Sequence, residues 1–413
     1  MRRDGSPFQL FSFAVTESPI GRVRFVLGRR GPKNQIHPGS AYGAFMEPEP
    51  DESGRSVRVA TLLLTNRECP WKCVFCDLWT NTLDETVPRG AIPEQIRGAL
   101  ASLSPARWIK LYNAGSFFDP HAIPPEDFPA IADLLAPFER VIVESHPALI
   151  DDREASRVLR FRDLLRAVPL ALADSAEPSR SIRETSPSGA ARSSQVSARP
   201  DVPATSGSPA LPLPSRVAPR GQTSPSPATR PTRRLEVAMG LETVHPFALE
   251  RLNKGMTLDD FSRAADVLRN ADIDLRAFVL VQPPYTPPDE AVSWAVRSVE
   301  FARDRGARFV ALIPTRGGNG AMEALRDSGE FVPPRLATLE EAFDRALELV
   351  SARATPIVAA DLWDLARFSD CAACFPAREA RLRRMNLSQQ VEPRVPCDCS
   401  SDAVRRVGSS REP

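Results

Sequence analysis

Short apolar runs alternate with amphipathic segments along most of the chain from residue 57 onward. The apolar runs are rich in Val, Ile and Leu, and several are apolar on both faces, which is typical of strands buried in a parallel sheet. They predict strands at 57–65, 108–113, 140–144, 235–241, 275–281 and 308–313. Segments of helical periodicity follow them and predict helices at 93–103, 125–135, 154–165, 257–271, 289–305 and 320–327. Six strand–helix units in series predict a parallel α/β fold, either doubly wound or a six-stranded partial barrel.

The same pattern divides the chain into a core and two extensions. Residues 1–55 have weak periodicity and several turn-forming residues, so we interpret them as an N-terminal extension. The strand–helix units occupy 56–330. A further predicted helix at 339–350 and an Arg-rich, Cys-containing tail belong to a C-terminal extension at 331–413.

Residues 175–234 interrupt the core. They contain 11 Pro and 13 Ser but no aromatic residue, so they cannot bury enough apolar surface to offset the entropy lost on ordering. We interpret them as a disordered insertion within one domain, because the units after it are needed to complete the sheet. Nine Arg against three acidic residues give the segment a net charge of +6, and the rest of the chain therefore carries about −5 (+1 minus +6).

Composition places the chain among ordinary globular proteins. Apolar residues make up 42% and charged residues 25%, and the net charge is +1, so bulk charge does not indicate nucleic-acid or membrane binding. No apolar stretch reaches the length of a membrane span, and the apolar run at 8–15 is too short for a signal peptide. We expect a cytoplasmic protein with no membrane partner.

The seven cysteines form two groups. Cys69, Cys73 and Cys76 lie within eight residues, and Cys371, Cys374, Cys397 and Cys399 lie near the C-terminus. Clustered cysteines in a cytosolic chain indicate metal ligands rather than disulfides.

The first group has the spacing Cys-x3-Cys-x2-Cys and follows the first predicted strand. In a parallel barrel this position is the C-terminal rim, where active sites assemble. Three thiolates on one tight loop can hold three corners of a cubane cluster and leave the fourth iron open for an outside ligand. The alternatives are a zinc site or three buried thiols, but zinc normally takes four ligands and no fourth Cys or His is close in sequence.

The spacing, the aromatic Phe75 before the last cysteine and the position after strand one resemble the radical S-adenosylmethionine (SAM) superfamily. The resemblance covers roughly 57–327 without the insertion. It implies a partial (βα)6 TIM-like barrel and a [4Fe–4S] cluster on Cys69, Cys73 and Cys76. The open iron would bind SAM, which the reduced cluster cleaves to a 5′-deoxyadenosyl radical. It also implies an electron donor of the flavodoxin or ferredoxin type and places Phe75 near the adenine.

Three further strand ends resemble SAM-binding elements of the family. After strand two, Asn113, Gly115 and Ser116 stand in the glycine-containing motif that receives the SAM amino group, although Ala114-Gly115-Ser116 departs from the family's Gly-Gly-Glu. Glu144 ends strand three and is expected to point into the site. The alternative readings are a strand-to-loop turn for the glycine motif and a surface acid for Glu144.

The fourth strand ends in Gly240 and Glu242, and Lys254 follows after a short helix. By the resemblance, Glu242 would bond the ribose or the amino group, and Lys254 or Arg251 the carboxylate of SAM. The alternative is an ordinary salt bridge at a helix cap.

The four late cysteines form two pairs, Cys371/Cys374 and Cys397/Cys399. Four soft ligands suit tetrahedral zinc or an auxiliary iron–sulfur cluster, and a tail with free thiols is the third possibility. The sequence leaves these open.

Within the superfamily the core looks most like the elongator-catalytic-subunit, methylthiotransferase and nitrogenase-cofactor type. Some runs also resemble the radical SAM subunit that builds archaeosine in tRNA. The leading hypothesis is therefore a radical SAM enzyme that acts on RNA, with tRNA as the candidate substrate. The alternatives are a tailoring enzyme for a peptide or small molecule and a non-catalytic iron–sulfur or zinc protein. The sequence assigns no catalytic residue that acts on the substrate.

Overall fold

The computed structural model describes residues 31–154, 156–171, 233–351 and 355–397. For two further short strands, β1 (Ala14–Glu17) and β2 (Val23–Val26), it describes the backbone pairing, which is antiparallel. Residues 175–232 of the predicted insertion lie outside the described residues. Its last two residues belong to the folded part, because Arg234 begins a strand and Arg233 is buried.

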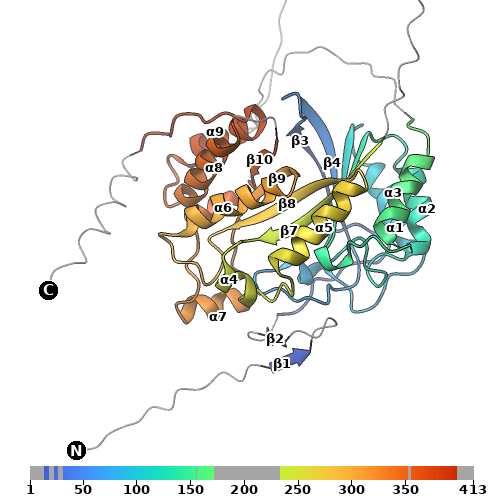
Figure 1. The fold of residues 1–413 in the computed structure, drawn as a ribbon, viewed down its shortest axis with the longest axis horizontal. Coiled ribbons are helices and arrows are strands. Elements are labelled where there is room, and N and C mark those ends of the chain that lie inside the picture. The colour runs from blue at the N-terminus through green and yellow to red at the C-terminus, as the bar shows by residue number, and fades with distance from the viewer. Residues whose placement is uncertain are drawn as a thin grey trace, which may run out of the picture. The chain divides into compact units, whose positions relative to one another are not determined.

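One curled sheet of eight strands forms the centre of the described structure (Figure 1). Its order is β10-β9-β8-β7-β6-β5-β4-β3, and every neighbouring pair is parallel except β3 and β4. The strands are β3 (Gly43–Pro50), β4 (Ser56–Leu64), β5 (Trp108–Asn113), β6 (Arg140–Glu144), β7 (Arg234–Glu242), β8 (Asp274–Val281), β9 (Ala307–Pro314) and β10 (Ile357–Ala360).

Helices cover the outer face of this sheet, as the crossover connections of parallel strands require (Figure 1). The α-helices are α1 (Ala91–Leu100), α2 (Phe128–Leu134), α3 (Arg157–Ala167), α4 (Pro246–Arg251), α5 (Leu258–Asn270), α6 (Ala291–Asp304), α7 (Ala321–Asp327), α8 (Leu336–Val350) and α9 (Phe375–Ser388). Four short 3-10 helices join them: η1 (Leu78–Asn81), η2 (Pro125–Asp127), η3 (Pro147–Leu149) and η4 (Leu365–Phe368). None of the helices in the described ranges is long and apolar enough to cross a membrane.

The predicted partial (βα)6 TIM-like barrel is confirmed, and the sheet contains two strands besides the six that were predicted. All six predicted strands are present, and β10 adds a seventh parallel strand beside β9. An eighth strand, β3, lies within the predicted N-terminal extension and pairs antiparallel with β4 along its whole length. Both predicted extensions thus contribute one strand to the sheet.

Helix α9 covers the open edge of β10. The side-chain amide of Asn386 bonds both the N–H and the C=O of Ala360, at 2.8 and 2.9 Å. The amide of Gln389 does the same at Val358, at 2.9 and 2.8 Å. These amides make the hydrogen bonds that a further neighbouring strand would make. The backbone groups at the edge of β10 are therefore not left without partners. Helix α9 also packs on β3, so it bridges the two edges of the sheet.

Charged side chains fill the interior at the N-terminal ends of the strands. Glu236 on β7 is fully buried and accepts hydrogen bonds from Arg276 at 2.6 Å, Arg308 at 2.7 Å and Arg140 at 3.0 Å. Arg276 also forms a two-fold pair with Glu49 on β3, at 2.8 Å for both contacts. Buried charges are tolerated only when paired this fully, so each carboxylate here offsets several cations.

Replacement of Glu236 by Gln should lower the free energy of unfolding by about 3–5 kcal/mol, because it leaves three buried guanidinium groups without their shared counter-charge. Urea unfolding measures the difference. The matched control is Glu341→Gln, which removes an exposed pair with Arg345 on α8 and should cost less than about 1 kcal/mol. Equal losses in the two variants would contradict the assignment of the cluster as a stability determinant.

Glu49 should make stability depend on acid pH. Burial alone would raise the pKa of Glu49, but Arg276 and Lys110 outweigh it and lower the pKa to about 2, from an ordinary 4.5. Because the folded pKa is the lower one, the ionised carboxylate stabilises the fold above pH 4.5, and this contribution is lost as the pH falls toward 2. The stability gap between the native protein and Glu49→Gln should therefore narrow across that window in pH-dependent urea unfolding. A difference in unfolding free energy that stays constant across this pH range would contradict the prediction.

Candidate functional site

The loop after β4 carries Cys69, Cys73 and Cys76 at the C-terminal rim. It is fastened from two other elements. The N–H of Val74 donates to the C=O of Leu252 at 3.0 Å, and the side-chain amide of Asn319 donates to the carbonyls of Val74 at 2.7 Å and Cys76 at 3.0 Å. Contacts to the end of α4 and to the loop after β9 therefore fix the course of the cysteine loop.

The three thiols lie within electrostatic reach of one another. Burial raises the pKa of Cys69 to about 12 and that of Cys76 well above its ordinary value, and the charge of Cys73 raises both further. The charge of Lys254 acts against these effects and lowers the pKa of Cys69. Thiolates gathered at such a place need a strongly positive partner, and a metal centre supplies one.

Two carboxylates and one lysine meet beside the cysteine loop. Lys254 donates to Glu242 at 2.6 Å, and both side chains are buried. Burial raises the pKa of Glu144 to about 8, while Lys254 lowers it and Glu242 raises it. Lys254 also interacts electrostatically with Cys73. The structure thus brings three predicted residues from β6, β7 and the segment after α4 close to the thiols.

Gly240 leaves the space that this ion pair occupies. A Cβ at Gly240 would lie 1.9 Å from Oε1 of Glu242 and 2.3 Å from Nζ of Lys254. The register of β7 against β8 shifts between Gly240 and Glu242, and Glu242 has a φ of +65°. Such left-handed backbone in a non-glycine residue is costly and is concentrated at functional sites.

Asn66, Asn113 and Gly115 lie together after the ends of β4 and β5. Oδ1 of Asn66 and both polar atoms of the Asn113 side chain are buried without a hydrogen-bond partner. A Cβ at Gly115 would lie 3.0 Å from Nδ2 of Asn66 and 3.4 Å from Nδ2 of Asn113. The glycine leaves room beside the two side-chain amides. The amide of Asn113 makes no hydrogen bond, and that of Asn66 uses only its Nδ2, which donates to the C=O of Arg67 at 2.7 Å.

Ser116 supports the neighbouring strand end. Its hydroxyl accepts the N–H of His146 at 2.9 Å. The His146 ring stacks on Trp71 of the cysteine loop, with ring centroids 3.9 Å apart, and its Nε2 lies 2.8 Å from the C=O of Lys254. His146 therefore holds the cysteine loop and the Lys254 segment together.

Phe75 has a different environment from the other predicted residues. It is partly buried and packs against the small apolar cluster of Val74, Met322, Leu325 and Phe331. This cluster joins the cysteine loop to α7.

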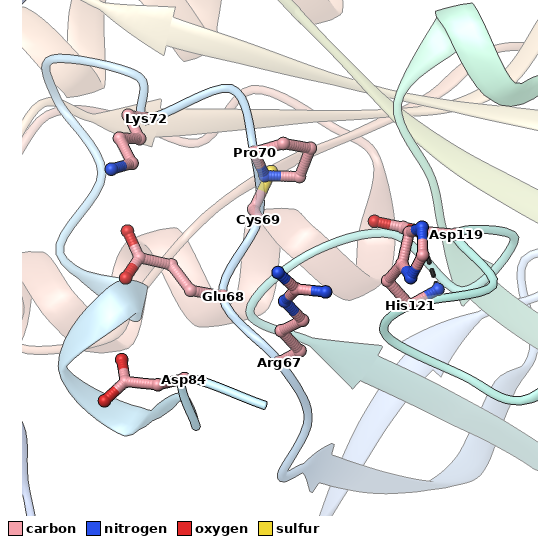
Figure 2. A pocket seen from close by; sticks show the side chains of 8 residues that line it. All are labelled: Arg67, Glu68, Cys69, Pro70, Lys72, Asp84, Asp119 and His121. Carbon is pink, nitrogen blue, oxygen red and sulfur yellow. Dashed lines mark hydrogen bonds between the residues drawn. The ribbon is translucent and has the colours of Figure 1, made fainter. Parts of the chain in front are cut away.

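A cavity of about 470 Å³ lies beside the cysteine loop (Figure 2). In Figure 2, Lys72, Glu68 and Asp84 lie on one side of it and Asp119 and His121 on the other. Its complete lining is Arg67, Glu68, Cys69, Pro70, Lys72, Asp84, Asp119 and His121. The walls carry both signs of charge, so they suit a polar ligand.

The late cysteines also come together. The sulfur atoms of Cys371, Cys374 and Cys397 all lie within 4.8 Å of one another. Hydrogen bonds from the backbone and side chain of Cys374, from Ala373 and from Cys397 lower the pKa of Cys371 to about 7. Cys399, the fourth predicted ligand, lies outside the described residues.

Some residues at the site were not found by sequence reasoning. Tyr42 precedes β3, and the pKa of its phenol is raised by burial and by the charges of Glu144 and Cys76. Nothing in the weakly periodic first 55 residues points to it. Asn66 and Asn319 carry a weak signal, since each is a polar residue in a loop after a predicted strand.

No family model matches the chain. The curated proteins similar to it include archaeosine synthase subunit beta from Thermococcus kodakarensis, 29% identical over 107 residues, or 26% of this chain and 33% of that protein. An uncharacterised protein of Methanocaldococcus jannaschii, MJ0550, is 25% identical over 109 residues, or 26% of this chain and 30% of its own length. The chain thus spans about a third of the curated relatives it matches.

Among solved structures, Elp3 from Methanocaldococcus infernus aligns with a TM-score of 0.42 at 11% identity, covering 79% of this chain and 63% of that one. Coproporphyrinogen III oxidase (HemN) from Escherichia coli, described as a radical SAM enzyme, aligns with a TM-score of 0.36 at 12% identity, covering 74% and 53%.

Replacement of Gly240 by Ala should destabilise the protein by about 1–3 kcal/mol, because the new methyl group overlaps the Lys254–Glu242 pair. In a Glu242→Ala background, which removes the closest clashing atoms, Gly240→Ala should cost less unfolding free energy than it does in the native protein. A double-mutant cycle by urea unfolding measures the difference. The matched control is Gly98→Ala in α1, where the Cβ meets nothing within 4 Å and should be neutral or slightly stabilising. Strict additivity of the two changes would contradict the assigned clash.

Proposed function

We propose that this chain is a radical SAM enzyme. In this proposal Cys69, Cys73 and Cys76 hold a [4Fe–4S] cluster, and SAM bound to its open iron is reductively cleaved to a 5′-deoxyadenosyl radical. The observation that carries the proposal is the convergence of three thiols on one loop at the C-terminal rim, beside a buried Lys254–Glu242 pair. The chain's own residues then hold the cluster, bind the ligand and exclude water.

The cysteine loop fits a site-differentiated cluster. Three thiolates leave one iron without a protein ligand. Lys254 interacts with the charges of Cys69 and Cys73, so it offsets part of the negative charge of the thiolates. Asn319 and Leu252 bind the backbone of the loop and keep the thiols in place.

The unpaired amide atoms of Asn66 and Asn113 fit the methionine part of SAM. An unpaired buried polar atom costs free energy, and Asn66 and Asn113 present three such atoms beside Gly115. An amino and a carboxylate group would satisfy them, as donor and acceptor respectively. Glu144 and Glu242 are proposed to bind the amino group or ribose, and Lys254 the carboxylate. Ser116 acts through the backbone of His146, and Phe75 is proposed to face the adenine.

An RNA base, with tRNA as the candidate, is the proposed substrate. The support is the sequence similarity to proteins named archaeosine synthase subunit beta, which covers about a quarter of this chain. A flavodoxin- or ferredoxin-type protein is the proposed electron donor, and the cytoplasm the proposed location. A peptide or small-molecule substrate is the second candidate, favoured by a cavity of only about 470 Å³ next to Cys69.

Anaerobically reconstituted protein should hold about four irons and four sulfides at this site and should form 5′-deoxyadenosine from SAM with dithionite. Cys73→Ala should lose these irons and the product, because two thiolates cannot retain the cluster. Iron analysis and chromatography of the product measure both. The control is Cys371→Ala, which should keep the iron and the cleavage. Product formation by Cys73→Ala at the native rate would refute the proposal.

The substrate class is tested in the same assay. Added unmodified tRNA should raise the yield of 5′-deoxyadenosine, and the digested tRNA should contain a nucleoside of changed mass. If tRNA has no effect while cleavage of SAM persists, the radical SAM assignment stands and the RNA substrate is wrong.

A further inference from the structure

Cys371, Cys374 and Cys397 form a second cysteine cluster on the C-terminal segment. Cys371 and Cys374 lie in the turn between η4 and α9, and Cys397 lies in the segment that follows α9. The sulfur atoms of Cys371 and Cys397 are 3.9 Å apart, and all three sulfurs lie within 4.8 Å of one another. The turn and the later segment are more than twenty residues apart in sequence, so the fold itself produces this meeting.

The sulfur separation distinguishes between the metal centres that the sequence left open. Zinc–sulfur bonds of 2.3 Å in a tetrahedron place the sulfurs about 3.8 Å apart. The thiolates of a cubane are spread much wider, because each binds a different iron. Within the described ranges, no other group of three or more Cys, His, Asp or Glu ligands is as compact. The spacing therefore fits a single metal ion.

The surroundings of the three thiols suit thiolate ligands. Cys374 is the N-cap of α9, where the helix dipole favours a negative charge. Arg378, one turn into the helix, interacts with Cys374 and is anchored by Glu340 at 2.6 Å. The N–H groups of Ala373 and Cys374 point toward the sulfur of Cys371. Backbone donors and a nearby guanidinium offset part of the charge that several thiolates bring to one ion.

We propose that Cys371, Cys374 and Cys397 bind one structural zinc ion. Structural zinc normally takes four ligands, so these three thiolates supply all but one of them. This choice excludes an auxiliary iron–sulfur cluster at the same residues. It does not depend on the proposed function at Cys69, Cys73 and Cys76.

The position of the ion explains what it would do. The segment after α9 runs back along the helix, where the fully buried Arg381 donates to the carbonyls of Glu392 and Pro393 at 2.7–3.0 Å and to Asp344 at 2.7 Å. Zinc would tie the end of this segment to the start of α9. Since α9 bridges β3 and β10, the ion would fasten the element that covers the open side of the sheet.

The test uses the full-length chain without a purification tag. A Cys69/Cys73/Cys76→Ala variant should retain about one zinc per chain and no iron. Cobalt exchanged into the site should give the intense visible bands and sulfur charge-transfer absorption of a tetrahedral thiolate site. Cys374→Ala in the same background should lose the zinc. Iron with sulfide, or no metal at all, would overturn the proposal.

Cys374→Ala could fail to fold, so chelation of the native protein provides a second measurement. Removal of zinc should speed proteolytic cleavage after Arg384 and Arg394 at least tenfold, and added zinc should restore resistance, whereas the four irons stay in place. Unchanged cleavage without zinc would overturn the structural role.

Discussion

The pair between Arg276 and Glu49 is the interaction on which the curl of the sheet depends. Glu49 lies on β3 at one edge, while Arg276 lies on β8, five strands away in the sheet order. Two side chains so far apart in a flat sheet cannot touch, but here they form two hydrogen bonds of 2.8 Å. Arg276 also binds Glu236 on β7, so one guanidinium joins both carboxylates across the interior. The cost of leaving any of these charges unpaired favours the curled form over a flat one.

The curl determines where chemistry can occur. All the parallel strands run in the same direction, so the paired charges at their N-terminal ends leave the C-terminal ends as the side where loops meet. The cysteine loop after β4, Glu144 at the end of β6 and Glu242 at the end of β7 are brought within reach there. Lys254 touches this group through Glu242 at 2.6 Å. The curl of the sheet thus has two consequences. It pairs the buried charges at the N-terminal ends of the strands, and it gathers strained and incompletely hydrogen-bonded residues at their C-terminal ends.

Local pattern predicted much of this, and long-range contacts account for what it missed. The six buried strands have continuous apolar runs, and Cys69, Cys73 and Cys76 have a diagnostic spacing, so both could be found from the sequence. Strand β3 contains Pro48 and Pro50 and is only partly buried, as an edge strand can be, and therefore it reads as irregular chain. Strand β10 has four residues, too few for a periodic signal. Their pairing depends on partners distant in sequence.

The site shows the same division. Glu144, Gly240, Glu242 and Lys254 could be selected because they end predicted strands or follow them closely. The role of Ser116 could not, since its hydroxyl serves the backbone of His146 from another strand. Tyr42 reaches Glu144 and Cys76 only because β3 lies beside β4.

For the two cysteine groups, the distances between sulfur atoms add information that the spacing of the cysteines in the sequence does not contain. Both groups can be written as metal motifs, and for the later one the sequence is compatible with zinc, with a cluster or with free thiols. The distance of 3.9 Å between the sulfur atoms of Cys371 and Cys397 supports the proposed zinc ion over a cubane, because it is close to the edge of a tetrahedron around one ion. Under the two proposals, the groups differ in role as well. The first lies on the rim among strained and unpaired groups, and the second lies where the chain returns to cover the edge of β10. A centre that reacts needs an open coordination position, whereas one that fastens a helix needs a closed shell, and the placement of each group in the fold matches that requirement.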